Sequence, residues 1–339
     1  MVAPRPGNVH DVDVCGIGSA LVDILVEATP AQVEACGLVK GSMQLMDLEA
    51  AASVHAAAPG GIERSGGSCA NTIAGLAALG GVGGFIGRVA DDRFGEVFAT
   101  GMTDLGIRFG AGGRADPADW ATGRCLVLVT PDADRTMCTT LGVAPQLGPD
   151  HLDAELIRAA HFTYLEGYLW DAPMAIDALR AAIEIAHAAG RRVALTLSDP
   201  FCVDRHRDEW RHVVANDLDL VFGNAAELCS LTETSTVEEA CKVVRRDGLT
   251  VTVTLGADGA VAFTGHEPIV SVPAAPVAHV VDTTGAGDLY AAGFLFGLAR
   301  GKDLETCARV GAIAAAEVIS HVGARPEADI AALVAPVLG

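Results

Sequence analysis

Positively charged side chains are scarce in this 339-residue chain, where 23 Lys and Arg stand against 43 Asp and Glu and give a formal net charge of −20. No block of basic residues offsets that imbalance. Nucleic acids and anionic membrane surfaces are bound by positive faces, so the composition argues against both as partners. Apolar residues make up 50% of the chain and charged residues 19%. This is too apolar for a disordered protein.

Closely spaced cysteine pairs are also missing, and we expect no signal peptide in the given sequence. The nine cysteines are odd in number and form no C-x-x-C pair, which favours a reduced, cytoplasmic protein over a disulfide scaffold or a zinc site. The first residues contain no apolar segment typical of a signal peptide. An uncharged stretch, 66–87, is rich in glycine and breaks at Gly80-Gly81. We therefore expect a short helix followed by a buried strand there, and not a membrane span.

Short β-branched runs alternate with helical patterns over much of the chain. The runs that indicate strands are 12–17, 124–129, 193–197, 218–222 and 251–255. The periodicity predicts helices that begin near Asp171 or Pro173, near Asp288 and at Leu304. Because strands and helices alternate from about residue 150 onward, we expect right-handed βαβ units and a parallel sheet.

Two segments interrupt this alternation. Residues 24–65 and 108–145 contain short strand-like pieces, and their only convincing helix is 30–36. The length of the chain allows two domains or one α/β unit with an appendage. We therefore expect the two segments to pair as a small β subdomain, inserted into the main α/β unit.

One glycine-rich turn carries the strongest chemical signal. Val280-Val281-Asp282-Thr283-Thr284-Gly285-Ala286-Gly287-Asp288 immediately precedes a helix-forming stretch. Unobstructed N–H groups at the positive end of a helix form an anion cradle, and a carboxylate in that first turn ionises easily. The alternative is a glycine-rich turn with an Asp that complements the helix dipole. No Walker P-loop motif occurs in the chain.

Four motifs together resemble a known family, the ribokinase-type (PfkB) sugar and nucleoside kinases. Residues 282–288 are similar to the family's C-terminal signature, and Gly66-Gly67-Ser68-Cys69-Ala70-Asn71-Thr72 to its N-terminal one. Asn224-Ala225-Ala226-Glu227 resembles the N-x-x-E element, and Thr254-Leu255-Gly256-Ala257-Asp258-Gly259 the nucleotide-side turn. The motifs occur in family order. Three further stretches, 164–170, 196–201 and 132–135, are most similar to the bacterial adenosine kinase branch.

The resemblance implies an α/β fold, a ribokinase-like three-layer α/β/α sandwich with a mainly parallel central sheet and a small β-sheet lid. The expected core is 1–21, 66–109 and 143–339, and the expected lid is 22–65 and 110–142. Gly66 and Gly67 would form the hinge, because glycine tolerates changes in φ at little cost. Closure of the lid would exclude water from the reaction.

The resemblance also implies the roles of the phosphate-side residues. Asp288 would be the general base, and the N–H groups of Gly285, Ala286 and Gly287 would stabilise the transferring phosphoryl group. The residues expected to bind ATP are Asn224, Thr254, Gly256, Gly259, Gly285 and Gly287. Arg135 would reach from the lid toward phosphate, although it could equally be an ordinary surface arginine in a hairpin turn.

Metal ions are expected on the same side. Asn224 and Glu227 would organise Mg²⁺ through water, which suits a cation that prefers oxygen ligands. The alternative is a helix start with a capping Asn. The family resemblance further suggests K⁺ near Asp282 and Thr284.

A second group of residues is expected to bind the phosphate acceptor. The resemblance implies that Asp23 binds vicinal sugar hydroxyls, with Gly67 and Asn71 completing the clamp. Ser68 would contact the base. The family often has Asn where this chain has Ser19, which puts one substrate contact in doubt.

Aromatic residues are few, yet Tyr164, Tyr168 and Trp170 lie close together after a predicted strand. A crevice at the carboxyl ends of parallel strands binds ligands in open α/β sheets. Tyr168 and Trp170 are therefore expected to stack against a purine. The alternative is that these aromatics cover the edge of the sheet.

The expected function is the ATP-dependent phosphorylation of the 5′-hydroxyl of adenosine. Two alternatives stay open: a kinase for a free sugar such as ribose or fructose, and a ligand-binding protein that transfers no phosphate. The small-molecule substrate is the expected partner. Family resemblance leaves the protein as a monomer or as a homodimer formed through the lids.

Overall fold

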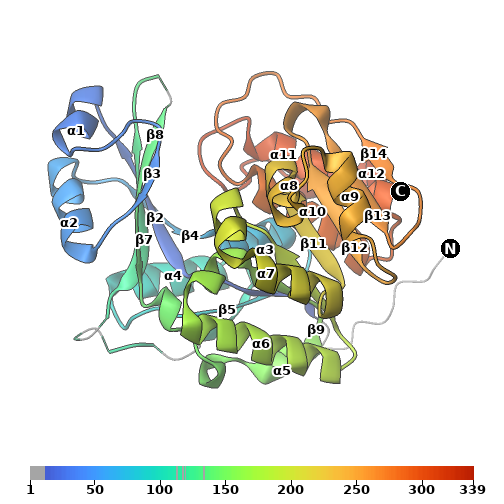
Figure 1. The fold of residues 1–339 in the computed structure, drawn as a ribbon. Coiled ribbons are helices and arrows are strands. Elements are labelled where there is room, and N and C mark those ends of the chain that lie inside the picture. Colours follow the sequence, from blue (N-terminus) through green and yellow to red (C-terminus); the bar gives the residue numbers. More distant parts are fainter. Residues whose placement is uncertain (1–11, 112–113, 117, 119, 133) are drawn as a thin grey trace.

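The computed structural model describes residues 12–111, 114–116, 118, 120–132 and 134–339. A nine-stranded sheet with the order β14-β13-β12-β11-β10-β9-β1-β5-β6 forms the centre of the molecule (Figure 1). Its strands are β1 Val12–Ile17, β5 Gly83–Gly87, β6 Arg108–Ala111, β9 Ala160–Glu166, β10 Arg192–Thr196, β11 Leu220–Asn224, β12 Thr250–Thr254, β13 Ala260–Thr264 and β14 Val270–Val272. All neighbours pair in parallel except β12–β13 and β13–β14.

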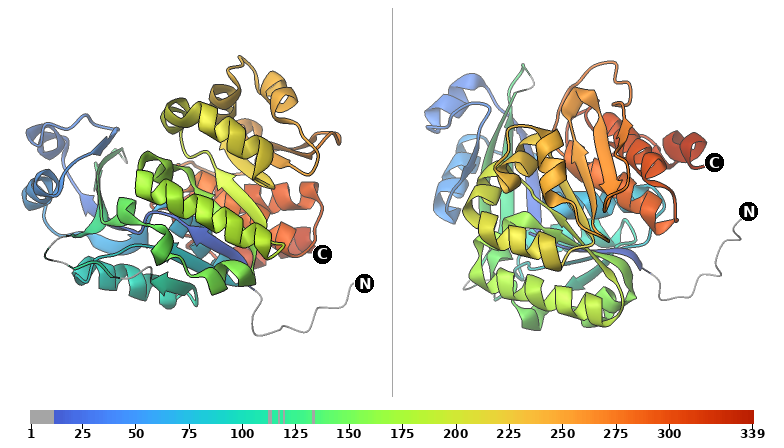
Figure 2. Two further views of the ribbon diagram at one scale, coloured as in Figure 1. Left: turned by 60° about the horizontal axis from the view of Figure 1, so that its bottom comes forward. Right: turned by 45° about the vertical axis from the view of Figure 1, so that its right-hand side comes forward.

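Helices cover both faces of this sheet (Figure 2). On one face lie α3 Ser68–Ala78, α10 Ala286–Ala299, α11 Leu304–Val318 and α12 Ile330–Leu338. On the other lie α5 Ala154–Ala159, α6 Pro173–Ala188, α7 Pro200–Asn216, α8 Ala225–Thr232 and α9 Val237–Val244. Successive residues of β1 alternate between two apolar cores, since Val14 packs on the α10 side and Cys15 on the α6 side. The expected three-layer α/β/α architecture is confirmed.

A second, five-stranded sheet stands beside the core (Figure 1). Its order is β3-β8-β7-β2-β4, from β2 Leu21–Glu27, β3 Met43–Leu45, β4 Ile62–Gly66, β7 Thr122–Val129 and β8 Arg135–Gly142. The helices α1 Pro30–Ala35 and α2 Leu48–Ala57 lie on its side away from the core. Helix α4 Arg93–Thr103 packs against strands of both sheets.

Three local expectations differ from the structure. Residues 108–111 form β6 and pair with β5 at the edge of the large sheet, so this part of 108–145 does not join the smaller one. Helix α2 was not expected, because its only buried residues are Ala51 and Val54 and it therefore shows no apolar stripe. Helix α6 starts at Pro173 as expected, but its N-cap is Ala172 and not Asp171.

The glycine-rich stretch 66–87 forms α3 and β5, as the sequence predicts. Within the described residues, no helix combines the length and the apolar character that crossing a membrane requires. The expectation of no signal peptide concerns residues 1–11, which lie outside the described residues.

Candidate active site

The loop before α10 holds the predicted anion cradle. Gly285 caps the helix with a φ of +81°, and a Cβ at this position would lie 2.7 Å from the Cβ of Ala324, so only glycine fits. The N–H of Ala286 already donates to the carbonyl of Thr283 at 3.2 Å. A Cβ on Gly287 would meet no atom within 4 Å, which shows open space above the first turn.

Asp288 in that first turn is held by two side chains of α3. Ser68 donates to its Oδ1 at 2.6 Å, and Asn71 Nδ2 donates to its Oδ2 at 3.2 Å. Burial raises the pKa of Asp288, against the opposing effects of these two hydrogen bonds and of the Arg325 charge. The Asp288 carboxyl therefore ionises less readily than its place at the positive end of a helix alone would predict. Ser68 thus contacts Asp288, and its expected contact with a substrate base stays a prediction.

Asp23 on β2 lies beside the hinge glycines. A Cβ at Gly66 would approach the Asp23 carboxyl carbon to 2.2 Å, and a Cβ at Gly67 would lie 2.4 Å from the Ser19 carbonyl oxygen. Burial raises the pKa of Asp23 to about 6, although Arg325 lowers it in part. Asp23 and Asn71 line one pocket, and the Oδ1 atom of Asn71 is buried without a hydrogen-bond partner.

Arg135 on β8 connects the smaller sheet to the cradle. It forms a buried ion pair with Asp282 and donates to Thr284 Oγ1 at 3.4 Å. Its Nε and Nη2 atoms are buried and have no hydrogen-bond partner. Asp282 also accepts from the N–H of Gly323 at 2.8 Å. Arg135 is therefore not an ordinary surface residue, and the Asp282 carboxylate is already neutralised by a cation.

Asn224 and Glu227 form a capping box at the start of α8. Glu227 Oε2 accepts from the Asn224 N–H at 2.8 Å, and Asn224 Oδ1 accepts from the Glu227 N–H at 2.9 Å. Burial, with a further contribution from the charge of Asp199, raises the pKa of Glu227 to about 7. The capping role is thus realised, and the proposed metal role stays a prediction.

The turn after β12 requires its glycines for conformational reasons. The 3-10 turn η4 Gly256–Asp258 follows Thr254, and Leu255 donates to the Gly259 carbonyl at 2.8 Å. Gly256 and Gly259 have φ values of +62° and +93°. A Cβ at Gly259 would lie 2.0 Å from the Val272 carbonyl oxygen.

The expected aromatic platform is wrong for Trp170. Its side chain is fully buried and packs edge-on against Trp210, with ring centroids 5.9 Å apart. Tyr164 is also buried, beside Phe222. Only Tyr168 in the 3-10 turn η3 Gly167–Asp171 reaches the surface, at 36% exposure, and its hydroxyl donates to the Ser198 carbonyl. Tyr164 and Trp170 lie in the two apolar cores beside β9, which is a central strand, so they do not cover an edge of the sheet either.

A buried carboxylate and a half-buried arginine of the site were not predicted from the sequence. Glu166 at the end of β9 accepts from the N–H groups of Ser19 and Cys69 at 3.3 and 3.0 Å, and burial raises its pKa to about 7. Arg325 donates to main-chain carbonyls on both sides of the hinge. Neither residue belongs to a local motif, and a position at a strand end would have been the only signal for Glu166.

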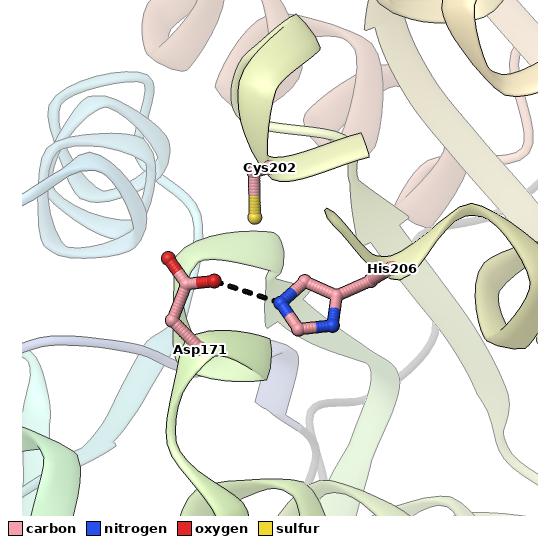
Figure 3. A group of neighbouring side chains, drawn as sticks. All are labelled: Asp171, Cys202 and His206. Atoms are coloured by element: carbon pink, nitrogen blue, oxygen red, sulfur yellow. Dashed lines mark hydrogen bonds and ion pairs between the residues drawn. The ribbon is translucent and has the colours of Figure 1, made fainter. Parts of the chain in front are cut away.

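A cluster away from this pocket resembles a metal site in composition only. Asp171, Cys202 and His206 bring their donor atoms within 4.8 Å of one another (Figure 3). Both Asp171 oxygens, however, accept hydrogen bonds from Arg205, at 2.9 and 2.6 Å. Burial raises the pKa of the Cys202 thiol to about 12. The arginine charge opposes a bound cation, so the cluster acts as an ion-pair network between η3 and α7.

Comparisons with known proteins support the kinase family that the four sequence motifs indicate. The family model described as pfkB family carbohydrate kinase matches residues 31–331. Adenosine kinase of Saccharomyces cerevisiae is 30% identical over 283 residues, covering 76% of this chain and 78% of its own. The crystal structure of adenosine kinase from Sinorhizobium meliloti has 42% identity and a TM-score of 0.87, with 95% and 98% of the two chains covered.

A probable sugar kinase from Rhizobium etli is similar at 38% identity, with a TM-score of 0.87 and coverage of 96% of this chain and 98% of that one. The fold and these likenesses define an ATP-dependent kinase that acts on the alcohol group of a sugar or nucleoside. The chain belongs to the pfkB carbohydrate kinase family, and its ribokinase-like fold is confirmed.

Proposed function

We propose that the protein transfers the γ-phosphoryl group of ATP to the 5′-hydroxyl of adenosine, giving AMP and ADP. The observation that carries the proposal is that two kinds of unsatisfied group line one pocket. Asn71, whose Nδ2 donates to Asp288, offers a buried, unpartnered acceptor, and Arg135 offers two buried, unpartnered donors at the cradle loop. Buried polar atoms without partners are rare in folded proteins. They fit an alcohol on one side and a phosphate on the other.

Asp288 is the proposed general base. The acceptor oxygen forms its bond to the γ-phosphorus while the bond from that phosphorus to the bridging oxygen of ADP breaks, and the hydroxyl proton passes to the Asp288 carboxylate. Ser68 and Asn71 hold both carboxylate oxygens. Their hydrogen bonds favour the ionised form and fix its orientation.

The remaining proposed roles follow from position. The N–H groups at Gly285 to Gly287 and the free donors of Arg135 would stabilise charge on the transferring group. The turn with Thr254, Gly256 and Gly259 would bind ATP together with Asn224.

Metal ions would lie on the same side of the site. The Glu227 carboxylate is buried and near the Asp199 charge, so a cation beside it would favour the ionised form of Glu227. Bound Mg²⁺ would supply neutralisation of phosphate charge. K⁺ near Asp282 and Thr284 would have to use oxygens other than the paired carboxylate.

The smaller sheet is the proposed lid, with Gly66 and Gly67 as the hinge. Asp23 and Gly67 would hold the ribose hydroxyls. The proposed segments are 22–65 and 110–142, with the correction that β6 belongs to the core sheet. A homodimer formed through the lids and a monomer both remain open.

A free-sugar kinase is the second candidate, and a specific observation favours it. The burial of Trp170 and Tyr164 removes two of the three aromatics that were expected to bind a base. Tyr168 is then the remaining aromatic candidate for contact with a purine. The Rhizobium etli relative described as a probable sugar kinase is consistent with this alternative.

The test measures ADP release with ATP, Mg²⁺ and K⁺ against adenosine, other nucleosides, ribose and fructose. Turnover on adenosine is the expected result, with the Asp288→Asn variant as the blank for contaminating kinases. Turnover only on a free sugar would contradict the adenosine proposal and retain Asp288 as base. Adenosine binding without ADP formation would favour the non-catalytic alternative.

A further inference from the structure

The loop between α11 and α12 inserts a half-buried arginine into the site. Arg325 Nη1 donates to the Ala70 carbonyl at 3.0 Å, and Nη2 donates to the Ser65 carbonyl at 2.7 Å and to Ser65 Oγ at 3.2 Å. Ser65 lies in β4 and Ala70 in the first turn of α3, so the guanidinium holds the main chain on both sides of Gly66 and Gly67. A rigid, planar fork of donors suits this role better than a flexible ammonium.

The same guanidinium lies near both carboxylates of the site. Arg325 lines the pocket with Asp23, and its charge acts on Asp23 and on Asp288. Burial lowers the pKa of Arg325 to about 10, so it remains a cation at neutral pH. A half-buried positive charge near two half-buried carboxylates favours their ionised forms.

The loop that carries Arg325 is fixed at both ends. Gly323 donates its N–H to Asp282 at 2.8 Å, next to the Arg135 ion pair. The N–H groups of Glu327 and Ala328 both donate to Glu317 Oε1 on α11, at 2.9 and 2.7 Å. Arg325 is therefore presented by a rigid support, as precise positioning requires.

We propose that Arg325 is a positioning residue of phosphoryl transfer, which fixes the hinge backbone and keeps Asp23 and Asp288 in their charged forms. The expected effect of Arg325 on turnover rests on the proposed function. Its expected effect on the ionisation of Asp23 and Asp288 does not, because that effect concerns the protein without substrate. The other titratable groups that face the two carboxylates or line their pocket are Cys69, Cys125, Tyr164, Glu166, Tyr168, Arg64 and Arg135. Two of these are arginines: Arg64 is exposed, and the Arg135 charge is paired with Asp282.

The kinetic test compares pH profiles of kcat/KM for ADP formation in Arg325→Gln, Arg325→Lys and the unmodified protein. The Gln variant should move the acidic limb upward by about one pH unit, so its activity at pH 6 should fall about tenfold further than at pH 8.5. Arg325→Lys should retain the position of the limb and lose activity uniformly. The matched control Arg64→Gln removes an exposed charge from the same pocket and should shift the limb less.

A uniform loss of activity in Arg325→Gln at all pH values would overturn the electrostatic role. The second measurement is a carbon NMR titration of protein labelled at the Asp carboxyl carbons, without substrate, with Asp23→Asn and Asp288→Asn used for assignment. Both carboxyls should titrate at higher pH in Arg325→Gln, and unchanged titration would contradict the proposal. This readout is independent of turnover, so inactivity of the unmodified protein on every acceptor would refute the proposed function alone. Thermal unfolding identifies variants that fail to fold.

Discussion

Asp288 is the side chain that would accept the proton in the proposed reaction. Replacement by Asn keeps an oxygen for the Ser68 hydroxyl and nearly the same volume, but it removes the proton acceptor. We expect kcat to fall by about a hundredfold or more, with acceptor binding nearly intact. Steady-state kinetics with direct measurement of acceptor affinity checks this split.

Asp208→Asn is the matched control, because it makes the same change in charge at an exposed position on α7. Its kcat should equal that of the unmodified protein. An Asp288→Asn protein that retains most of its turnover would remove Asp288 as the general base.

The raised pKa of Glu166 predicts that this residue makes the folded protein less stable as the pH rises. Its pKa is about 7 in the folded protein and near 4.5 in an unfolded chain. The folded state therefore binds the proton more tightly, so this contribution to stability is fully present below pH 4.5 and is lost as the pH rises through 7. The difference corresponds to roughly 3 kcal/mol.

Glu166→Gln should therefore flatten the dependence of the melting temperature on pH between 5 and 8. The exposed Glu184→Gln variant on α6 should leave that dependence unchanged. Equal slopes in the Glu166→Gln and unmodified proteins would show that Glu166 titrates normally.

The residues that the sequence could predict all belong to short contiguous motifs. Asp288, Asn71 and Asn224 are examples, because each sits at a helix start whose chemistry is local. Glu166 and Arg325 acquire their roles from partners far away in the chain, which a single sequence does not reveal. Trp170 was misassigned because a strand end indicates a crevice but not which side of the following turn faces it.

At the scale of elements, helices and strands with a clear apolar pattern in the sequence were predicted correctly, and elements without such a pattern were not. Strand β1 matches its predicted bounds, and α10 and α11 lie within two residues of theirs. Helix α2 was missed because it covers a sheet with only two buried residues. The assignment of β6 depends on pairing with β5, which no local pattern encodes.

The turn after β12 offers a matched pair of substitutions within one element. Ala at Gly256 must adopt a φ of +62° but meets no atom, which should cost about 1 kcal/mol. Ala at Gly259 must also adopt a φ of +93° and would place its Cβ 2.0 Å from the Val272 carbonyl oxygen. We expect a loss of about 3 kcal/mol or more there.

Chemical denaturation of the two variants measures the difference. If the turn binds ATP, Gly259→Ala should also raise the KM for ATP more than the KM for the acceptor. Equal stabilities of the two variants would show that the turn can shift to accommodate a side chain.

At the scale of the whole molecule, the smaller sheet and the core meet through a buried ion pair. Arg135 comes from β8, and Asp282 comes from the loop before α10. Removing one partner leaves the other charge buried and unpaired, which costs about 3–5 kcal/mol. The sequence indicated an insertion beside an α/β core, but only the fold shows which charges join the two sheets.

Arg135→Met and Asp282→Asn should each destabilise the protein, and the double variant should lose less than the sum by about 1–3 kcal/mol. Hydrogen exchange should speed up in β7 and β8 while the large sheet stays protected, because the pair is a contact between the sheets. Lys40→Met is the control: it breaks an ion pair with Asp132 between two turns beside the smaller sheet and should change neither measurement appreciably. Additive single effects, or faster exchange throughout both sheets, would show that Arg135 supports the fold as a whole and does not fix the smaller sheet against the core.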